Sequence, residues 1–200
     1  MDEQAGFSHP VEAQIMARIA PAVRDRARAV RMMVFDVDGI LTDGSLWYGE
    51  HGETLKRFNA LDGHGLRLMR EQGVQIAWVT GRESPITARR AAELGIAPVV
   101  QGVRDKVESL EALAHESGLA MGDLGFMGDD IIDLAVLQRV GFAATVPNAP
   151  FYISQAAHWV ATREGGAGAV RECCDLILAA QGRLGACFSA RLSPLGGAIQ

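Results

Sequence analysis

Short apolar runs alternate with helical patterns along most of the chain, and this alternation restricts the possible folds more than any other feature. The first run, at residues 32–35, is uninterrupted, which is typical of a strand buried on both faces. Strand candidates follow at residues 75–79, 98–100, 124–127, 142–145 and 158–161, separated by helical patterns at about residues 63–72, 84–94, 105–117, 130–138, 150–156 and 168–181. Right-handed strand–helix–strand units of this kind predict an α/β fold with a Rossmann-like, mainly parallel sheet flanked by helices.

Two segments lie outside this alternation. Residues 1–10 are expected to be frayed, and the apolar positions that follow at helical spacing are divided by Pro21 into two helices. After the first strand, two strand-like runs flank the stretch 49–52, so residues 45–58 are predicted to form a β-hairpin. A hairpin that protrudes from a parallel sheet is suited to act as a flap or as a contact between subunits.

The length and composition of the chain limit its organisation and its partners. Its 200 residues predict a single domain, residues 1–200, with a flexible tail at about 185–200. The formal net charge is −5 and the basic residues form no patch, so nucleic acid is not an expected partner. No apolar run is long enough to cross a membrane. The three cysteines, Cys173, Cys174 and Cys187, have no metal-site spacing, and reduced thiols favour a cytoplasmic location.

Polar residues gather at the strand ends where open α/β sheets bind their ligands. Asp36 and Asp38 follow the first strand, Thr80 follows the second and Asp129 the fourth, while Lys106 opens the helix after the third. Several carboxylates at one edge repel one another, and a phosphate adds to this repulsion. A divalent cation with oxygen ligands, such as Mg²⁺, removes both difficulties, so the pattern predicts a site for Mg²⁺ and a phosphate group.

These residue types suggest phosphoryl transfer through a covalent intermediate. We expect Asp36 to attack phosphorus, while Asp38 protonates the departing oxygen and then activates water. Gly39 permits a turn that separates the two carboxylates. Lys106 supplies a compact positive charge for a phosphate oxygen, and it is one of only two lysines in the chain, the other being Lys56.

Other interpretations of the aspartate motif agree less well with the sequence. A calcium loop requires ligands and a glycine at positions that Ile40, Leu41 and Trp47 occupy here. Turn capping would explain Asp36 and Asp38 alone. It does not explain why further polar residues follow, in order along the chain, at the ends of two other predicted strands and at the start of a predicted helix.

The ordered motifs resemble those of the haloacid dehalogenase superfamily of phosphatases. The resemblance lies in Asp36-Val37-Asp38-Gly39, Thr80-Gly81-Arg82, Asp105-Lys106 and Gly128-Asp129-Asp130. Phe58-Asn59, Asp62-Gly63 and the stretch 168–172 further resemble a branch that removes phosphate from an eight-carbon keto sugar acid in lipopolysaccharide precursor synthesis. The resemblance spans about residues 24–184 and implies a phosphoric monoester hydrolase.

The resemblance also implies a role for each matching residue. It implies that Mg²⁺ is held by the carboxylates of Asp36 and Asp129 and by the backbone carbonyl of Asp38. Thr80 and Lys106 would bind the phosphate, with Asp130 and Asp133 orienting the lysine and the metal ligands. The residues expected at the sugar acid are Asn59, Ala60, Leu61, Asp62, Gly63, Arg67, Arg82 and Arg90. Arginine suits this task because its guanidinium binds a carboxylate in bidentate fashion.

The spacing of the motifs leaves no room for a cap domain, so the protein is expected to be capless. A site open to water loses electrostatic stabilisation, which favours coverage by neighbouring subunits. The hairpin residues Trp47 and Tyr48 are candidates for such a contact, and the resemblance implies a homotetramer built through the hairpin.

Three alternative functions remain at this point. A phosphatase of a nine-carbon sugar acid shares the chemistry, but that relative carries Glu where this chain has Arg82. A capless phosphatase of proteins or nucleic acids predicts a monomer with an exposed groove. A non-catalytic module would not require the complete set of nucleophile, acid, lysine and metal ligands.

Overall fold

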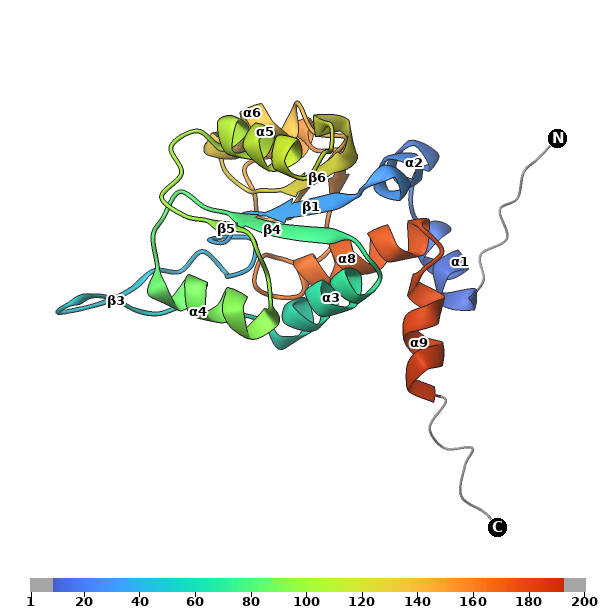
Figure 1. The fold of residues 1–200 in the computed structure, drawn as a ribbon, viewed down its shortest axis with the longest axis horizontal. Coiled ribbons are helices and arrows are strands. Elements are labelled where there is room, and N and C mark those ends of the chain that lie inside the picture. The colour runs from blue at the N-terminus through green and yellow to red at the C-terminus, as the bar shows by residue number, and fades with distance from the viewer. Residues whose placement is uncertain (1–8, 193–200) are drawn as a thin grey trace, which may run out of the picture.

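The computed structural model describes residues 9–192 and contains the parallel sheet that the sequence predicts (Figure 1). Its six strands have the order β5-β4-β1-β6-β7-β8, and every neighbouring pair is parallel. Their bounds are β1 Met32–Phe35, β4 Gln75–Val79, β5 Val99–Val100, β6 Leu124–Met127, β7 Phe142–Thr145 and β8 Trp159–Val160. The central position of β1, β4 and β6 brings the ends of the strands that carry the predicted site residues next to one another.

Helices cover both faces of the sheet (Figure 1). Alternate residues of β1 point to opposite faces: Met33 and Phe35 join one apolar core, and Met32 and Val34 the other. The first core is completed by α1 Pro10–Met16, α2 Pro21–Ala29, α3 Ala60–Glu71, α4 Pro85–Leu94, α8 Ala169–Ala180 and α9 Leu184–Leu192. The second is completed by α5 Lys106–Glu116, α6 Leu134–Leu137 and α7 Phe151–Ala156, with short 3-10 turns η1 Met121–Asp123 and η2 Ile131–Asp133 beside β6.

Polar N-caps start the helices that follow the hairpin, β4 and β5. Asn59 caps α3, Ser84 caps α4 and Asp105 caps α5, and each side chain accepts a hydrogen bond from a backbone N–H of its helix. The α4 and α5 N-termini follow the carboxyl ends of β4 and β5. Their dipoles therefore add partial positive charge on the side of the sheet where an anion is expected.

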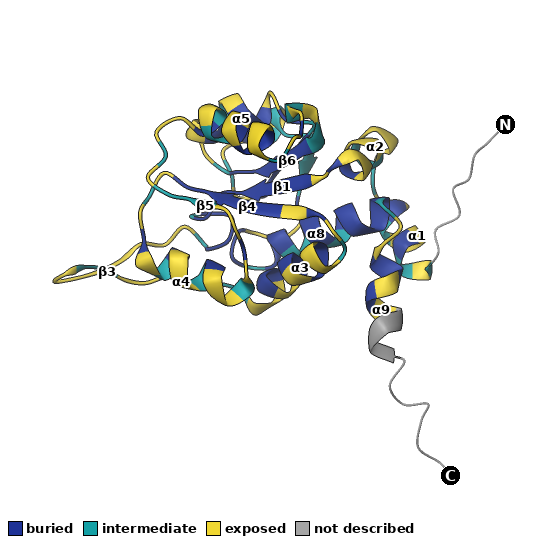
Figure 2. Cartoon of the chain, in the orientation of Figure 1, coloured by how far each residue is buried: buried dark blue, intermediate teal, exposed yellow. Residues whose placement is uncertain are grey.

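The predicted hairpin is present as the antiparallel pair β2 Trp47–Gly49 and β3 Gly52–Leu55. It extends away from the body of the molecule, and its strands are largely exposed (Figure 2). Between β1 and α3 the chain forms only this hairpin and its connecting loops, in agreement with the capless architecture.

The C-terminal region differs from the expected flexible tail at about 185–200. Residues 184–192 form helix α9, because Leu184 and Cys187 are buried at helical spacing and Phe188 stacks on His9 with ring centroids 5.2 Å apart. The backbone N–H of Gly185 donates to the buried carboxylate of Glu12 at 2.8 Å. The remainder of the expected tail, and most of the N-terminal stretch expected to be frayed, lie outside the described residues.

No helix within residues 9–192 is both long enough and apolar enough to cross a bilayer.

Replacement of Leu66 by alanine tests the packing of α3 against α8. Leu66 is fully buried in the first core, so Leu66→Ala is expected to lower the free energy of unfolding by about 2–5 kcal/mol. Leu61→Ala, five residues earlier on the same helix and 54% exposed, is the matched control, with an expected change within about 0.5 kcal/mol. Denaturant unfolding at equal protein concentration measures both, and equal effects would contradict the assignment of Leu66 to the core.

Candidate active site

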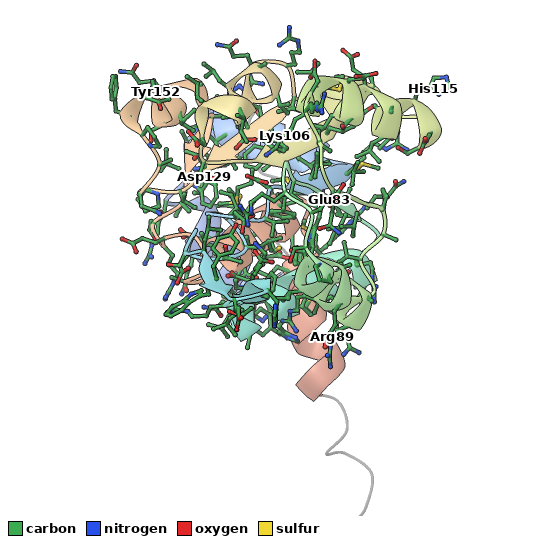
Figure 3. The ribbon with its side chains drawn as sticks, turned by 90° about the vertical axis from the view of Figure 1, so that its left-hand side faces the viewer. Glu83, Arg89, Lys106, His115, Asp129 and Tyr152 are labelled. Atoms are coloured by element: carbon green, nitrogen blue, oxygen red, sulfur yellow. The ribbon has the colours of Figure 1, made fainter. Side chains whose placement is uncertain are left out.

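The predicted catalytic residues meet at the carboxyl ends of the three central strands. Phe35 at the end of β1 is in register with Trp78 of β4 and with Met127 of β6. The next residues, Asp36, Thr80 and the segment leading to Asp129, therefore emerge side by side. Figure 3 looks onto this end of the sheet, with Lys106 and Asp129 near the middle of the view.

Lys106 connects the ends of β1 and β6 through two carboxylates. It is the first residue of α5, and its side chain is 3% exposed. Its Nζ lies 3.0 Å from Asp36 Oδ1 and donates to Asp133 Oδ1 at 2.6 Å. The Oδ2 of Asp133 accepts the backbone N–H groups of Asp129 and Asp130 at 3.0 and 3.3 Å, which fixes the loop after β6. Lys106 and Asp133 thus hold both carboxylates of the proposed metal site in place.

Asp36, Asp129 and Asp133 offer oxygen atoms within 4.8 Å of one another. Burial raises the pKa of Asp36 to about 6. Burial, reinforced by the charges of Asp36 and Asp133, raises the pKa of Asp129 to about 7. Carboxylates that ionise this reluctantly gain from a hard divalent cation, so the donor set fits Mg²⁺. Because Asp133 already accepts from Lys106 and two backbone groups, Asp36 and Asp129 are the carboxylates left to hold the ion.

The loop after β1 approaches Asp129 closely because residue 39 is glycine. A Cβ at Gly39 would lie 2.0 Å from Asp129 Oδ2, and the φ of Gly39 is +88°. The same loop is supported from behind by Gly165, where a Cβ would lie 1.7 Å from the carbonyl oxygen of Gly39, and by Gly166, whose N–H donates to Ile40 O at 3.0 Å. The stretch just before α8 therefore supports the loop that carries Asp36 and Asp38.

Asp38 faces a different set of cations from Asp36. Its Oδ1 accepts a hydrogen bond from Lys56, and its Oδ2 lies 3.5 Å from Arg82 Nε. The predicted separation of the two carboxylates is therefore present: one lies against Lys106, the other against Lys56. Lys56 in turn lies 3.1 Å from Glu53 of β3.

Sequence reasoning missed Lys56 and Glu53 as members of the site. Both belong to the hairpin, which the sequence identifies only as a possible flap or subunit contact. The scarcity of lysine was the available signal, because Lys56 and Lys106 are the only two in the chain and both are buried.

Thr80 and Arg82 occupy the loop after β4. Thr80 is buried, and its Oγ1 accepts the N–H of Arg82 at 3.4 Å. Arg82 Nη2 donates to the hydroxyl of Tyr48 on the hairpin at 2.7 Å. Both residues line a pocket of about 260 Å³ at the strand ends, together with Asp36, Asp38, Gly44, Leu46, Gly81, Asp129, Asp130 and Ile132.

Several residues expected at the sugar acid have partners within the fold instead. Asp62 is buried, and its Oδ1 accepts the backbone N–H of Arg171 at 2.7 Å in the first turn of α8. Burial raises its pKa. Gly63 is also buried, and a Cβ there would lie 2.5 Å from Arg90 Nη2. Within the fold, Asp62 joins α3 to α8 and Gly63 makes room for an arginine, while their expected contact with the sugar acid stays a prediction.

The remaining expected sugar contacts are spread around the pocket. Asn59 caps α3 and donates to Gly166 O at 3.4 Å. Ala60 and Leu61 are exposed. The two outlying arginines do not line the 260 Å³ pocket: Arg67 pairs with Glu71 at 2.9 Å, and Arg90 lies over the ring of Phe58 at 5.9 Å. Of the three predicted arginines, Arg82 alone lines the pocket that holds Asp36.

Arg90 lines an adjoining hollow of about 490 Å³ between β3 and α4, together with Lys56 and Phe58. A larger hollow of about 610 Å³ lies between α1, α2, β8 and α8. This larger hollow shares no residue with the strand-end pocket, so the chemistry of the side chains, and not the volume, locates the site.

Comparison with known proteins agrees with this geometry. The haloacid dehalogenase-like hydrolase family matches residues 95–171. The 3-deoxy-D-manno-octulosonate 8-phosphate phosphatase KdsC of Salmonella typhimurium is 38% identical over 166 residues, which cover 83% of this chain and 88% of that protein. KdsC of Yersinia pestis is 39% identical over 83% of this chain and 89% of its own. The chain belongs to this phosphatase family.

Solved structures of relatives have the same fold. A probable YrbI family phosphatase from Pseudomonas syringae matches with a TM-score of 0.85 and 42% identity, covering 87% of this chain and 99% of its own. The Moraxella catarrhalis 3-deoxy-D-manno-octulosonate 8-phosphate phosphatase, solved with a magnesium ion, a phosphate ion and KDO, matches with a TM-score of 0.82 and 37% identity over 84% and 97% of the two chains. The resemblance seen in the sequence is confirmed, and this family member is a phosphoric monoester hydrolase with a capless, haloacid dehalogenase-like fold.

The raised pKa values of Asp36 and Asp129 predict how Mg²⁺ affects thermal stability at different pH values. Without metal, the folded chain keeps protons on these carboxyls that the unfolded chain releases near pH 4, so stability falls as pH rises towards 7. Mg²⁺ favours the ionised carboxylates. The gain in Tm on adding Mg²⁺ is therefore expected to be larger at about pH 8 than at about pH 5.5.

Differential scanning fluorimetry with Mg²⁺ and with chelator measures this gain. Asp129→Asn is expected to remove most of it, whereas Glu111→Gln, which changes an exposed carboxylate on α5 outside the pocket, is the control. Equal gains at both pH values, or a full gain in Asp129→Asn, would contradict the assignment of the metal ligands.

Proposed function

We propose that this protein hydrolyses 3-deoxy-D-manno-octulosonate 8-phosphate to the free sugar acid and phosphate in an Mg²⁺-dependent reaction that supplies a lipopolysaccharide precursor. The observation that carries the proposal is the meeting of Asp36, Asp38, Thr80 and Asp129 in one pocket at the strand ends, with the buried Lys106 3.0 Å from Asp36 behind it. Relatives that are 37–39% identical and carry this activity in their names support the choice of substrate.

The phosphate group binds between Lys106 and Thr80. Lys106 contributes a buried positive charge from the N-terminus of α5, and Thr80, after β4, lines the same pocket as Asp36, after the neighbouring β1. In this partly dry pocket a cation interacts more strongly with phosphate oxygens than it would in water. Asp36, adjacent to Lys106, then lies beside the phosphorus atom.

The reaction proceeds in two displacements. Asp36 attacks phosphorus, so the Asp36–phosphorus bond forms as the bond to the sugar oxygen breaks, and Asp38 gives its proton to that oxygen. Asp38 then takes a proton from water, which attacks phosphorus and releases phosphate, regenerating the Asp36 carboxylate. Two aspartates with different partners suit this division of labour, because the nucleophile stays ionised while the other moves protons.

Asp36 and Asp129 would hold Mg²⁺, with the backbone carbonyl of Asp38. When bound, the ion neutralises the negative charge that gathers where carboxylates and phosphate meet. Asp133 and Lys106 keep Asp36 and Asp129 in place for this task.

Arg82 binds the sugar acid at the rim of the pocket. Its side chain is 36% exposed and lines the strand-end pocket, so its guanidinium is placed to pair with the carboxylate of the substrate there. A phosphatase of a nine-carbon sugar acid is the alternative within the same chemistry, and a phosphatase of macromolecules is the alternative from another branch.

The protein acts as a homotetramer in the cytoplasm. The hairpin supports the first part, because Leu46, Trp47, Tyr48 and Leu55 expose large apolar surfaces beside a pocket that has no cap. The free thiols of Cys173, Cys174 and Cys187 support the second, because they suit a reducing compartment.

Phosphate release from a panel of sugar phosphates, with and without chelator, tests the proposed reaction. Turnover should be highest for 3-deoxy-D-manno-octulosonate 8-phosphate and should disappear with chelator. Asp36→Asn should lower kcat by more than about 1000-fold with an unchanged circular dichroism spectrum, because the nucleophile is lost and the fold is kept. A preference for the nine-carbon substrate would reject the proposed eight-carbon substrate. Turnover in Asp36→Asn would reject Asp36 as the nucleophile.

The double substitution Trp47→Ser with Leu55→Ser tests the role of the hairpin in assembly. The two side chains are paired in register and are each more than half exposed, so the substitutions should lower the oligomeric state and reduce activity about tenfold or more. Light scattering after gel filtration measures the mass. Phe151→Ser, which changes an apolar side chain 73% exposed on α7, is the control. A fully active tetramer in the double variant would contradict the assembly.

A further inference from the structure

Lys56 has a position that the phosphate site does not explain. Lys106 serves the phosphate, yet Lys56, the second lysine of the chain, is buried as completely, with a side chain only 1% exposed. It sits just after β3, at the base of the hairpin, where its neighbour Arg57 points outward with a side chain 67% exposed. A buried ammonium group is stable only with close anionic partners.

The partners of Lys56 are one carboxylate from the catalytic loop and one from the hairpin. Its Nζ donates to Asp38 Oδ1 and lies 3.1 Å from Glu53 Oε1. Glu53 is in turn held by Ser84 Oγ and by Arg82 Nη2, the latter at 3.4 Å. The base of the hairpin is therefore joined both to the proton-transferring aspartate and to the segment that follows β4.

This arrangement fixes the direction of the Asp38 carboxylate. Lys56 binds Oδ1 of Asp38, and Oδ2 lies near Arg82 Nε. Asp38 and Arg82 both line the strand-end pocket, so Oδ2 lies on the side of that pocket. A carboxylate held at one oxygen by a buried donor has lost most of its rotational freedom, and proton transfer requires a defined distance and direction to the departing oxygen. A buried ion pair adds little net stability, so orientation is its more important effect.

We infer that Lys56 is a positioning residue that aims the Asp38 carboxylate at the leaving oxygen, and that the hairpin sets this aim through Glu53. The inference rests on the proposed phosphatase function and deepens it. It makes the hairpin part of the proton-transfer apparatus in addition to its role as a surface for assembly.

Two substrates with different leaving groups distinguish a Lys56 that orients Asp38 from a Lys56 that only anchors the hairpin. A sugar oxygen must be protonated as it departs, whereas p-nitrophenolate departs without a proton. When the Asp38 carboxyl group is no longer oriented toward the leaving oxygen, phosphorylation of Asp36 by the sugar phosphate is therefore impaired. Phosphorylation by p-nitrophenyl phosphate is not. Hydrolysis of the aspartyl-phosphate still needs Asp38 as the base and slows with both substrates.

Pre-steady-state kinetics of Lys56→Met with Mg²⁺ test the inference. With the sugar phosphate, kcat should fall about 100-fold while KM stays within about threefold of wild type. With p-nitrophenyl phosphate, the variant should release one equivalent of nitrophenolate in a fast burst before a slow steady state. Lys56→Arg should recover part of the lost rate, and Arg57→Met, the exposed neighbour, should match wild type within about twofold.

Combination with Asp38→Asn provides a second test. If Lys56 acts through Asp38, the double variant should be no slower than Asp38→Asn alone. An equal loss with both substrates and no burst, or a further loss in the double variant, would overturn the inference and leave Lys56 as an anchor of the hairpin. Should Lys56→Met not fold, Lys56→Gln, which keeps a hydrogen-bond donor, is measured in the same way.

Failure of the inference is separable from failure of the proposed function. Wild-type protein that hydrolyses neither ester refutes the function itself. Wild-type protein that hydrolyses both, beside a Lys56→Met variant with unchanged kinetics, refutes only the role of Lys56.

Discussion

The contact of Lys106 with Asp36 and Asp133 is the interaction on which the site depends. The parallel sheet brings carboxylates together at the ends of β1 and β6, and their mutual repulsion would separate these ends without a buried cation between them. Lys106 supplies that cation from α5, and Asp133 passes the restraint on to the backbone of the loop after β6. The remaining excess of negative charge is what makes the pocket receptive to Mg²⁺.

The sheet and the strand-end residues were predictable because both follow from local pattern. Continuous apolar runs such as 32–35 and 76–79 specify strands buried on both faces, and parallel connectivity places their carboxyl ends at one edge. The positions of Asp36, Thr80 and Lys106 follow from these two facts. Helix α9 was not predicted because its burial depends on contacts with α1 and His9 that lie nearly the whole chain away in sequence.

The outer part of the site was less predictable, because it depends on how segments distant in sequence fold against one another. Nothing local to Lys56 or Glu53 shows that the base of the hairpin reaches Asp38. Asp62 illustrates the opposite case, since a polar residue beside the expected sugar contacts turns inward to the start of α8. In both cases the side chain's direction, which the sequence pattern does not specify, decides its role.

Gly165 and Gly166, in the stretch just before α8, pack tightly against the loop after β1. Because no side chain separates the two backbones, a displacement of Gly165 or Gly166 by even a fraction of an ångström moves the loop that carries Asp36 and Asp38. The packing of α8, which begins three residues after Gly166, therefore affects the position of the catalytic loop. A change in side-chain volume at positions far from the substrate is then expected to alter the alignment of the two aspartates.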